Sequence, residues 1–217
     1  MCNIVLSHPT ESKSVSRWHR LLAVGLTCVS LTSGCVALSR AGDASPSIKI
    51  LVTYHSLAGS TERMAEAVVA GAQSVARSQV VLKRVGQVTA DDLFSADAVI
   101  VGSPVYWSNM SGEVKTFFDN WQFKFGVFPE FKMKNKVGAA FATGGQVSSG
   151  KEVTMLTILA AMLGNQMIVV SDGGAFGASA TTEADSPGID DQELANARAL
   201  GRRVAEVTKL VQAGSSH

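Results

Sequence analysis

A strand that runs straight into a helix through a loop of small residues, at residues 48–64 (IKILVTYHSLAGSTERM), most constrains the fold of this chain. The β-branched run Ile48–Tyr54 predicts a buried strand, and apolar residues three and four positions apart from Met64 onward predict an amphipathic helix. The loop 55–61 between them directs several backbone N–H groups and a helix N-terminus toward one point. Such an arrangement favours a bound phosphate.

The candidate phosphate contacts all lie in this loop and at the start of the helix. They are Ser56, Leu57, Ala58, Gly59, Ser60 and Thr61. The hydroxyl groups can donate hydrogen bonds, and the glycine lets a ligand approach the backbone closely. The loop has neither the lysine of a P-loop nor the three-glycine spacing of a dinucleotide fingerprint, so a monophosphate is the favoured ligand. These residues alone are equally compatible with an ordinary helix N-cap at Ser60 or Thr61.

Composition limits the classes of protein to consider. The 217 residues suffice for one domain and a modest extension. The formal net charge is +1, and from Ser47 onward 15 Lys and Arg face 16 Asp and Glu, a net of −1, so nothing points to nucleic acid. The cysteines Cys2, Cys28 and Cys35 all precede residue 36. The later region therefore has no disulfide and no cysteine-based metal site.

The N-terminal segment has the order of a secretory signal: basic residues, then an uncharged run at 21–34, then small residues. We expect a signal in 1–35, a tether in 36–46 and a folded domain in 47–213. Residues 31–35 (LTSGC) resemble a lipobox, which predicts lipidation of Cys35 and a location at the cell envelope or periplasm. Cleavage after Ala41 would instead release the protein from the membrane, and a wrongly assigned start codon would leave it cytoplasmic.

The remaining chain alternates strand and helix patterns. Strands are predicted at 79–85, 96–102, 137–143 and 167–171, and helices at 111–121, 152–163 and 194–211. With the first strand, five strands alternating with helices predict an α/β protein with a doubly wound parallel sheet and helices on both faces. Ligands of such sheets bind beyond the carboxyl ends of the strands.

Two further strand ends carry unusual loops that would meet the first one. The second loop contains Tyr106 and Trp107, whose flat side chains can lie against a ring system. The third, 143–149, is glycine-rich and can offer backbone N–H groups. Singly, the aromatics could be core residues and the glycines a turn. Together, a phosphate site and a surface for a planar polar ring predict flavin mononucleotide (FMN).

Several short stretches match motifs of one known family. No single stretch is decisive, but their number and their order along the chain make the resemblance strong. The stretches are 54–56 with Gly59, 62–67, 82–85, 102–104 with 109–110, 116–119, 177–179 and 193–201. From residue 49 to residue 211 the chain resembles the flavodoxin-like quinone reductases, the WrbA-like family. The resemblance implies a flavodoxin-like five-stranded sheet of order 2-1-3-4-5, FMN as cofactor and a homo-oligomer, either dimer or tetramer.

The resemblance also assigns parts of the cofactor to residues. It places the phosphate at 56–61, the ring at Val105, Tyr106 and Trp107, and the ring and ribityl chain at Thr143, Gly144, Gly145, Gln146 and Val147. Pro104 and Asn109 are further expected cofactor contacts in the second loop. The implied reaction is two-electron reduction of a quinone by NAD(P)H through FMN. Since the flavin carries this chemistry, no catalytic acid or base is expected. His55 is expected to be a packing residue, and Glu113 and Asp119 to lie on a solvated helix face.

Three features depart from the family pattern and leave the substrates open: Ala58, residues 164–166, and the unusually aromatic segment 121–131. Ala58 stands where relatives often carry an aromatic residue, and Asn165 stands in place of a histidine. Phe125 falls near the position of an aromatic over the flavin, so Phe125 and Asn165 are candidate substrate contacts. Two rivals therefore remain: a flavodoxin-type electron carrier, although carriers are usually strongly acidic, and a non-catalytic FMN-binding protein of the cell envelope.

Overall fold

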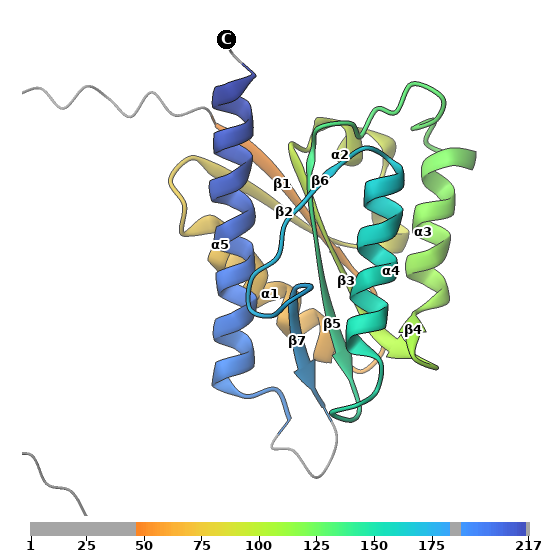
Figure 1. Ribbon diagram of the computed structural model, residues 1–217, viewed down its shortest axis with the longest axis vertical. Helices are drawn as coiled ribbons and strands as arrows, with labels where there is room; N and C mark the ends of the chain where they lie inside the picture. The colour runs from red at the N-terminus through yellow and green to blue at the C-terminus, as the bar shows by residue number, and fades with distance from the viewer. Residues whose placement is uncertain (1–46, 183–187, 216–217) are drawn as a thin grey trace, which may run out of the picture. The chain divides into compact units, whose positions relative to one another are not determined.

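The computed structural model describes residues 47–182 and 188–215, which contain a parallel sheet covered by helices on both faces (Figure 1). The strands are β1 (Ile48–Tyr54), β2 (Ser78–Arg84), β3 (Ala98–Tyr106), β5 (Val137–Gly144), β6 (Ile168–Val169) and β7 (Ala178–Thr181). Their order is β2-β1-β3-β5-β6, with β7 also parallel to β5. The predicted α/β class and the order 2-1-3-4-5 are confirmed.

The helices divide between the two faces of the sheet. Helices α1 (Ser60–Gln73) and α5 (Asp191–Gly214) pack together on one face, while α2 (Ala90–Ser95), α3 (Gly112–Phe123) and α4 (Lys151–Gly164) cover the other (Figure 1). Successive strand residues point to opposite faces. Accordingly, Ile50 and Val52 of β1 join the core under α1 and α5, whereas Leu51 joins the core under α3 and α4.

The last strand differs from its prediction. The sequence predicts one strand at 167–171, but only Ile168–Val169 pair with the start of β5, opposite Val137 and Gly138. The chain then leaves the sheet and returns as β7, which pairs with Phe141–Gly144 at the other end of β5. The departing segment contains Gly173 and Gly177 at positive φ, a conformation unsuited to a strand. Apolar periodicity could not reveal this split, because each piece pairs with a different part of β5.

A short hairpin was also absent from the sequence prediction. The strand β4 (Asn109–Met110) pairs antiparallel with the end of β3 through a two-residue turn at Trp107 and Ser108. Both turn residues have positive φ, 50° and 62°. Sequence signals for such turns rely on glycine and asparagine, which this turn lacks. In the described part of the chain, no helix is long and apolar enough to cross a membrane.

Candidate functional site

The three predicted loops meet in one crevice at the carboxyl ends of β1, β3 and β5. Its lining residues are Ser56, Leu57, Ala58, Ser60, Thr61, Pro104, Val105, Tyr106, Thr143, Gly144, Gly145 and Thr182. All except Thr182 belong to the predicted site. The crevice encloses about 180 Å³. That volume suits a phosphate and part of a linker chain, so an attached ring system has to lie over the open rim.

The first turn of α1 is left without a side-chain cap. The residue preceding the helix is Gly59, at φ 89° and ψ −16°, and its N–H donates to Ser56 Oγ at 3.0 Å. The alternative of an N-cap at Ser60 or Thr61 is therefore wrong. The first backbone N–H groups of a helix have no intrahelical acceptors, and they carry the positive end of the helix dipole. They can donate to an anion in the crevice.

The floor of the crevice is fixed by a hydrogen bond between two loops. Thr61 Oγ1 and Thr143 Oγ1 lie 2.7 Å apart, and both residues are buried. This bond ties the phosphate loop to the end of β5. Both hydroxyls thus sit beside the uncapped start of α1, as a phosphate site requires.

The hairpin presents aromatic surface at the rim. Trp107 is fully exposed and Tyr106 is 37% exposed. Partial burial of the ring, and to a lesser extent the nearby carboxylate of Glu113, raise the pKa of Tyr106. Leu57 and Val147 are also exposed, on the first and third loops. A planar ring bound here would cover apolar surface that is otherwise in water.

The third loop lies where the sequence predicted it, but its Gly144 has a packing role that the sequence did not reveal. A Cβ on Gly144 would lie 2.0 Å from Ser149 Oγ and 3.0 Å from Lys151 Cγ. The missing side chain therefore makes room for Ser149 and Lys151 of the same chain. Gln146 and Val147 are exposed and do not line the crevice.

Besides Gly59, Trp107, Gln146 and Val147, which border the crevice without lining it, three predicted site residues lie away from it: Asn109, Phe125 and Asn165. Asn109 Oδ1 accepts a hydrogen bond from Thr157 Oγ1 at 2.9 Å, which holds the hairpin to α4. Asn165 donates to Ala161 O at the end of α4. Phe125 packs against the core on the α3 side. Within this chain, Asn109 and Asn165 line a separate groove between α3 and α4, so the structure does not bring Phe125 or Asn165 to the crevice. Cys35 lies outside the described residues.

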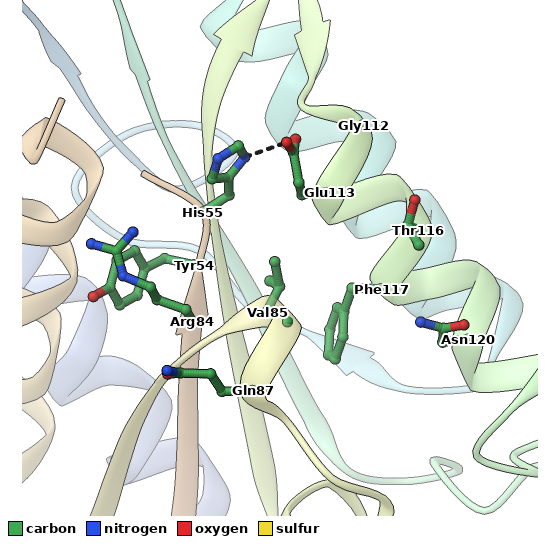
Figure 2. Close-up of a pocket in the computed structure, with 11 residues that line it drawn as sticks. Tyr54, His55, Arg84, Val85, Gln87, Gly112, Glu113, Thr116, Phe117 and Asn120 are labelled. Carbon is green, nitrogen blue, oxygen red and sulfur yellow. Dashed lines mark ion pairs between the residues drawn. The ribbon is translucent and has the colours of Figure 1, made fainter. Parts of the chain in front are cut away.

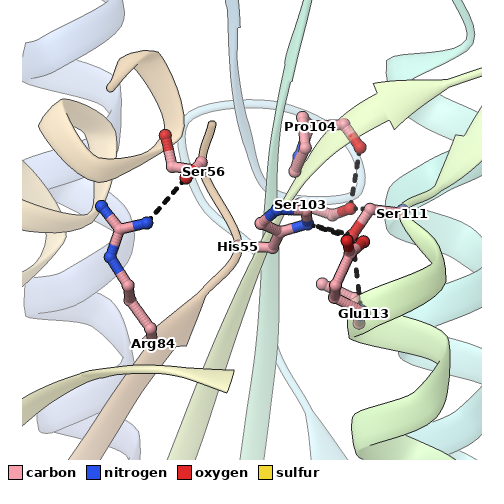
Figure 3. Close-up of polar contacts among 8 residues, drawn as sticks. His55, Ser56, Arg84, Ser103, Pro104, Ser111 and Glu113 are labelled. Carbon is pink, nitrogen blue, oxygen red and sulfur yellow. Dashed lines mark hydrogen bonds and ion pairs between the residues drawn. The ribbon is translucent and has the colours of Figure 1, made fainter. Parts of the chain in front are cut away.

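A polar network behind the phosphate loop was missed by the sequence interpretation (Figure 3). His55 is buried, and its Nδ1 lies 2.9 Å from both Ser111 Oγ and Glu113 Oε2. Arg84 donates to Ser56 O at 2.7 Å and pairs with Glu62 at 2.8 Å. Glu113 is thus more than a solvated residue, because it ties α3 to the end of β1. Local sequence patterns could not reveal this network, since its partners are 22 to 58 residues apart.

This network borders a second and larger cavity of about 740 Å³ (Figure 2). Tyr54, His55 and Arg84 form one side, and Thr116, Phe117 and Asn120 of α3 form the other. None of the predicted site residues lines it. The cavity shares two wall residues with the support of the phosphate loop: His55, where the loop begins, and Arg84, which donates to Ser56 O.

The donor set of the crevice fits FMN. Its lining residues include no charged side chain, and it combines hydroxyls, an uncapped helix start and exposed aromatic surface. Uncharged donors at a helix N-terminus suit a single phosphate, and flat side chains suit an isoalloxazine ring. Among the described residues no three His, Cys, Asp or Glu side chains are grouped to hold a metal ion.

Known proteins with similar sequence and structure point the same way. The family described as NADPH-dependent FMN reductase matches residues 86–182. An NAD(P)H dehydrogenase (quinone) of Geotalea daltonii is 32% identical over 208 residues, covering 76% of this chain and all of the relative. A flavodoxin of Clostridium saccharobutylicum is 31% identical over 166 residues, covering 76% of this chain and 99% of the relative.

Solved structures agree with these relatives. The flavodoxin-like, WrbA-like protein of Agrobacterium tumefaciens superposes with a TM-score of 0.63 at 27% identity, over 76% of this chain and 99% of the other. A flavodoxin from an archaeon superposes with a TM-score of 0.60 at 25% identity, over 75% and 99%. By its fold, its strand-end loops and its relatives, the chain belongs to the WrbA-like family of flavodoxin-fold, FMN-binding proteins.

Proposed function

We propose that this protein is an FMN-dependent oxidoreductase that uses NAD(P)H to reduce quinones by two electrons. The observation that carries the proposal is the meeting of three strand-end loops around a crevice with an uncapped helix start and exposed aromatics. Relatives named NAD(P)H dehydrogenase (quinone), at 32% identity over nearly their whole length, support it. When bound, FMN supplies the electron-accepting and electron-donating ring.

The residues of the chain bind and orient. Ser56, Ser60, Thr61 and the first N–H groups of α1 would hold the phosphate, and Thr143 would fix the register between the loops. Tyr106 and Trp107 would cover one side of the ring and exclude water from it. The lining contains no carboxylate, histidine or lysine, and Tyr106 is its one side chain with a titratable proton.

A second candidate is a flavodoxin-type electron carrier. The lengths of the two alignments favour it. The alignment with the Clostridium flavodoxin spans 166 residues and covers 76% of this chain, and the alignment with the Geotalea quinone dehydrogenase covers the same 76% but spans 208 residues. The dehydrogenase thus has residues with no counterpart here. Against this candidate stands the net charge of −1 from Ser47 onward, because carriers dock through strongly acidic surfaces.

Steady-state kinetics with the purified FMN-loaded protein separates the candidates. The oxidoreductase consumes one NADPH or NADH per benzoquinone reduced, with saturation in both substrates. A carrier or a non-catalytic FMN-binding protein leaves the nicotinamide unoxidised under the same conditions, although dithionite still reduces its flavin. The comparison of NADH with NADPH also fixes the nicotinamide preference, which Ala58 leaves open.

We further propose that the protein works at the cell envelope, tethered to the membrane through lipidated Cys35. The support is the order of basic, apolar and small residues in 1–35 and the twelve-residue spacing from Cys35 to Ser47. Fractionation of cells making the full chain tests it against Cys35→Ser. Wild type in the membrane fraction and Cys35→Ser outside it is the expected result. An uncleaved chain in the cytosol would contradict the proposal.

We also propose a homo-oligomer. Helix α4 exposes apolar side chains on one face, Val153, Leu156 and Leu163, each more than 40% exposed. These residues follow one another at helical spacing, and covering them would remove apolar area from water. Sedimentation equilibrium of the purified protein tests the proposal: a mass of two or four chains is expected, and a single-chain mass at micromolar concentration would contradict it.

A further inference from the structure

Lys151, the first residue of α4, is a buried lysine beside the crevice. Only 5% of it is exposed, and its Nζ donates to Thr181 Oγ1 at 2.5 Å and to Gln146 O at 3.3 Å. Both acceptors are uncharged. The two hydrogen bonds hold the third loop against β7, but they do not neutralise the ammonium.

The charge of Lys151 has no carboxylate partner among the described residues. The ion pairs found there involve Lys83, Arg84, Lys115 and His55. Removing an ammonium from water is costly unless an opposite charge compensates it. A well-packed apolar side chain at this position would avoid that cost. The lysine therefore stabilises this site only when an anion lies nearby.

The position of Lys151 identifies where that anion would be. Its stem packs against Gly144, since Cγ lies 3.0 Å from where a Cβ of that glycine would be. Its acceptors Gln146 and Thr181 are the chain neighbours of Gly145 and Thr182, which line the crevice. Lys151 thus lies directly behind the crevice wall formed by the third loop and β7.

Arg84, the described cation that contacts the first loop, already has a carboxylate partner. The lining residues are uncharged, and Arg84, which supports the first loop from behind, is paired with Glu62 at 2.8 Å. A ligand phosphate carries up to two negative charges, and the hydroxyls together with the helix dipole of α1, equivalent to about half a positive charge, do not balance them fully. A buried charge acts over longer distances than an exposed one because little water screens it.

We propose that Lys151 is a positioning residue that balances the charge of the ligand phosphate from behind the third loop. It would thereby give the crevice much of its preference for FMN over riboflavin. The inference rests on the proposed FMN site. Lys151 acts through the field of its ammonium and through the loop that it holds, without being a lining residue.

The test measures FMN and riboflavin affinities of the full-length chain by fluorescence quenching, together with the melting temperature of the apoprotein. Lys151→Met removes the charge at similar volume, Lys151→Gln keeps polar contacts, and Lys151→Arg keeps the charge. Lys136→Met is the matched control. That lysine also donates to two uncharged oxygens, of Phe94 and Ala96, and does not line the crevice.

We expect Lys151→Met and Lys151→Gln to weaken FMN binding roughly ten- to a hundredfold, with riboflavin affinity changed less than about threefold. The apoprotein of Lys151→Met should melt at the wild-type temperature or above it, because an uncompensated buried charge is gone. Lys151→Arg should keep most of the affinity, and Lys136→Met should leave FMN affinity unchanged.

Two results would overturn the inference about Lys151 and leave the proposed function standing. One is FMN affinity at the wild-type level in Lys151→Met and Lys151→Gln. The other is an equal loss of FMN and riboflavin affinity accompanied by a lower melting temperature, which a purely structural role predicts. A wild-type protein that binds neither flavin would instead overturn the proposed function, and the inference with it.

Discussion

The hydroxyl oxygens of Thr61 and Thr143 lie 2.7 Å apart in the buried floor of the crevice, and they join two loops that are 82 residues apart in the sequence. One loop begins α1 and the other ends β5. Both residues are almost fully buried, so the two hydroxyls are each other's hydrogen-bond partners, and this bond fixes the distance between the two loops that line the crevice.

Thr143→Val keeps the shape of the side chain and removes its hydroxyl. Thr61 Oγ1 is then left buried without its partner, which costs about 1–3 kcal/mol. We expect a drop of that size in the free energy of unfolding and roughly a tenfold loss of FMN affinity, measured by denaturant titration and by fluorescence. Thr157→Val is the control, since the hydroxyl of Thr157 on α4 donates to Asn109 of β4, away from the crevice. An unaltered affinity in Thr143→Val would separate this bond from the site.

Gly59→Val should damage FMN binding about tenfold more than Ser60→Ala. Gly59 has φ 89°, where a side chain costs about 1–2 kcal/mol, and a Cβ there projects into open space beside the helix start. Ser60→Ala removes one donor among several. Gly126→Val is the matched control, because Gly126 also has positive φ, 71°, and open space around it, but lies after α3. Equal FMN affinities for the two valine variants would contradict the phosphate site.

Trp107→Ala should loosen the ring while leaving the phosphate contacts in place. Trp107 is fully exposed in a turn at φ 50°, so its removal costs the fold little. FMN and riboflavin affinities should both fall, by similar factors of about ten, and the reduction potential of bound FMN should shift. Phe123→Ala, equally an exposed aromatic but on α3, should change neither. An unchanged potential in Trp107→Ala would remove Trp107 from the site.

The alkaline stability of the protein should depend on Tyr54. Burial, and then the hydrogen bond to Glu62 and its charge, raise the pKa of Tyr54 from 10.0 to about 12. A raised pKa stabilises the fold below pH 10, and this contribution disappears as the pH rises from 10 toward 12. Tyr54→Phe should therefore flatten the fall in the free energy of unfolding over that range. The same steep fall in Tyr54→Phe and in wild type would contradict the assignment.

Absorbance at 295 nm provides an independent reading of the same group. The chain has two tyrosines, Tyr54 and Tyr106. Tyr106 is 37% exposed, so water stabilises its phenolate and it should ionise at a lower pH than Tyr54. The buried Tyr54 should ionise near pH 12. Tyr54→Phe should remove the later step only.

Much of the fold and the lining of the crevice could be predicted from the sequence because both depend on local patterns. The β-branched run at 48–54 and the apolar run at 96–102 form central strands, and the carboxyl ends of parallel strands necessarily meet at one edge. The first, second and third loops were therefore placed together correctly. Eleven of the twelve lining residues follow from that rule and the family resemblance.

The remaining features depend on contacts between distant residues. Asn109 had a plausible place beside the ring, but Thr157 on α4 draws its amide oxygen to the other side of the hairpin. Nothing in the local sequence distinguishes Lys151 from a surface lysine. In the structure it is buried, and it donates a hydrogen bond to Thr181, thirty residues later. His55 and Glu113 are likewise 58 residues apart. Periodicity carries no information about such pairs.

Calorimetric titration of the apoprotein with FMN and, separately, with riboflavin tests the central claim most directly, because the claim is that the crevice binds FMN through its phosphate. We expect FMN to bind one per chain with a dissociation constant of about 1 µM or below, and riboflavin to bind at least about a hundredfold more weakly. No heat with FMN, or equal affinities for the two flavins, would contradict the account.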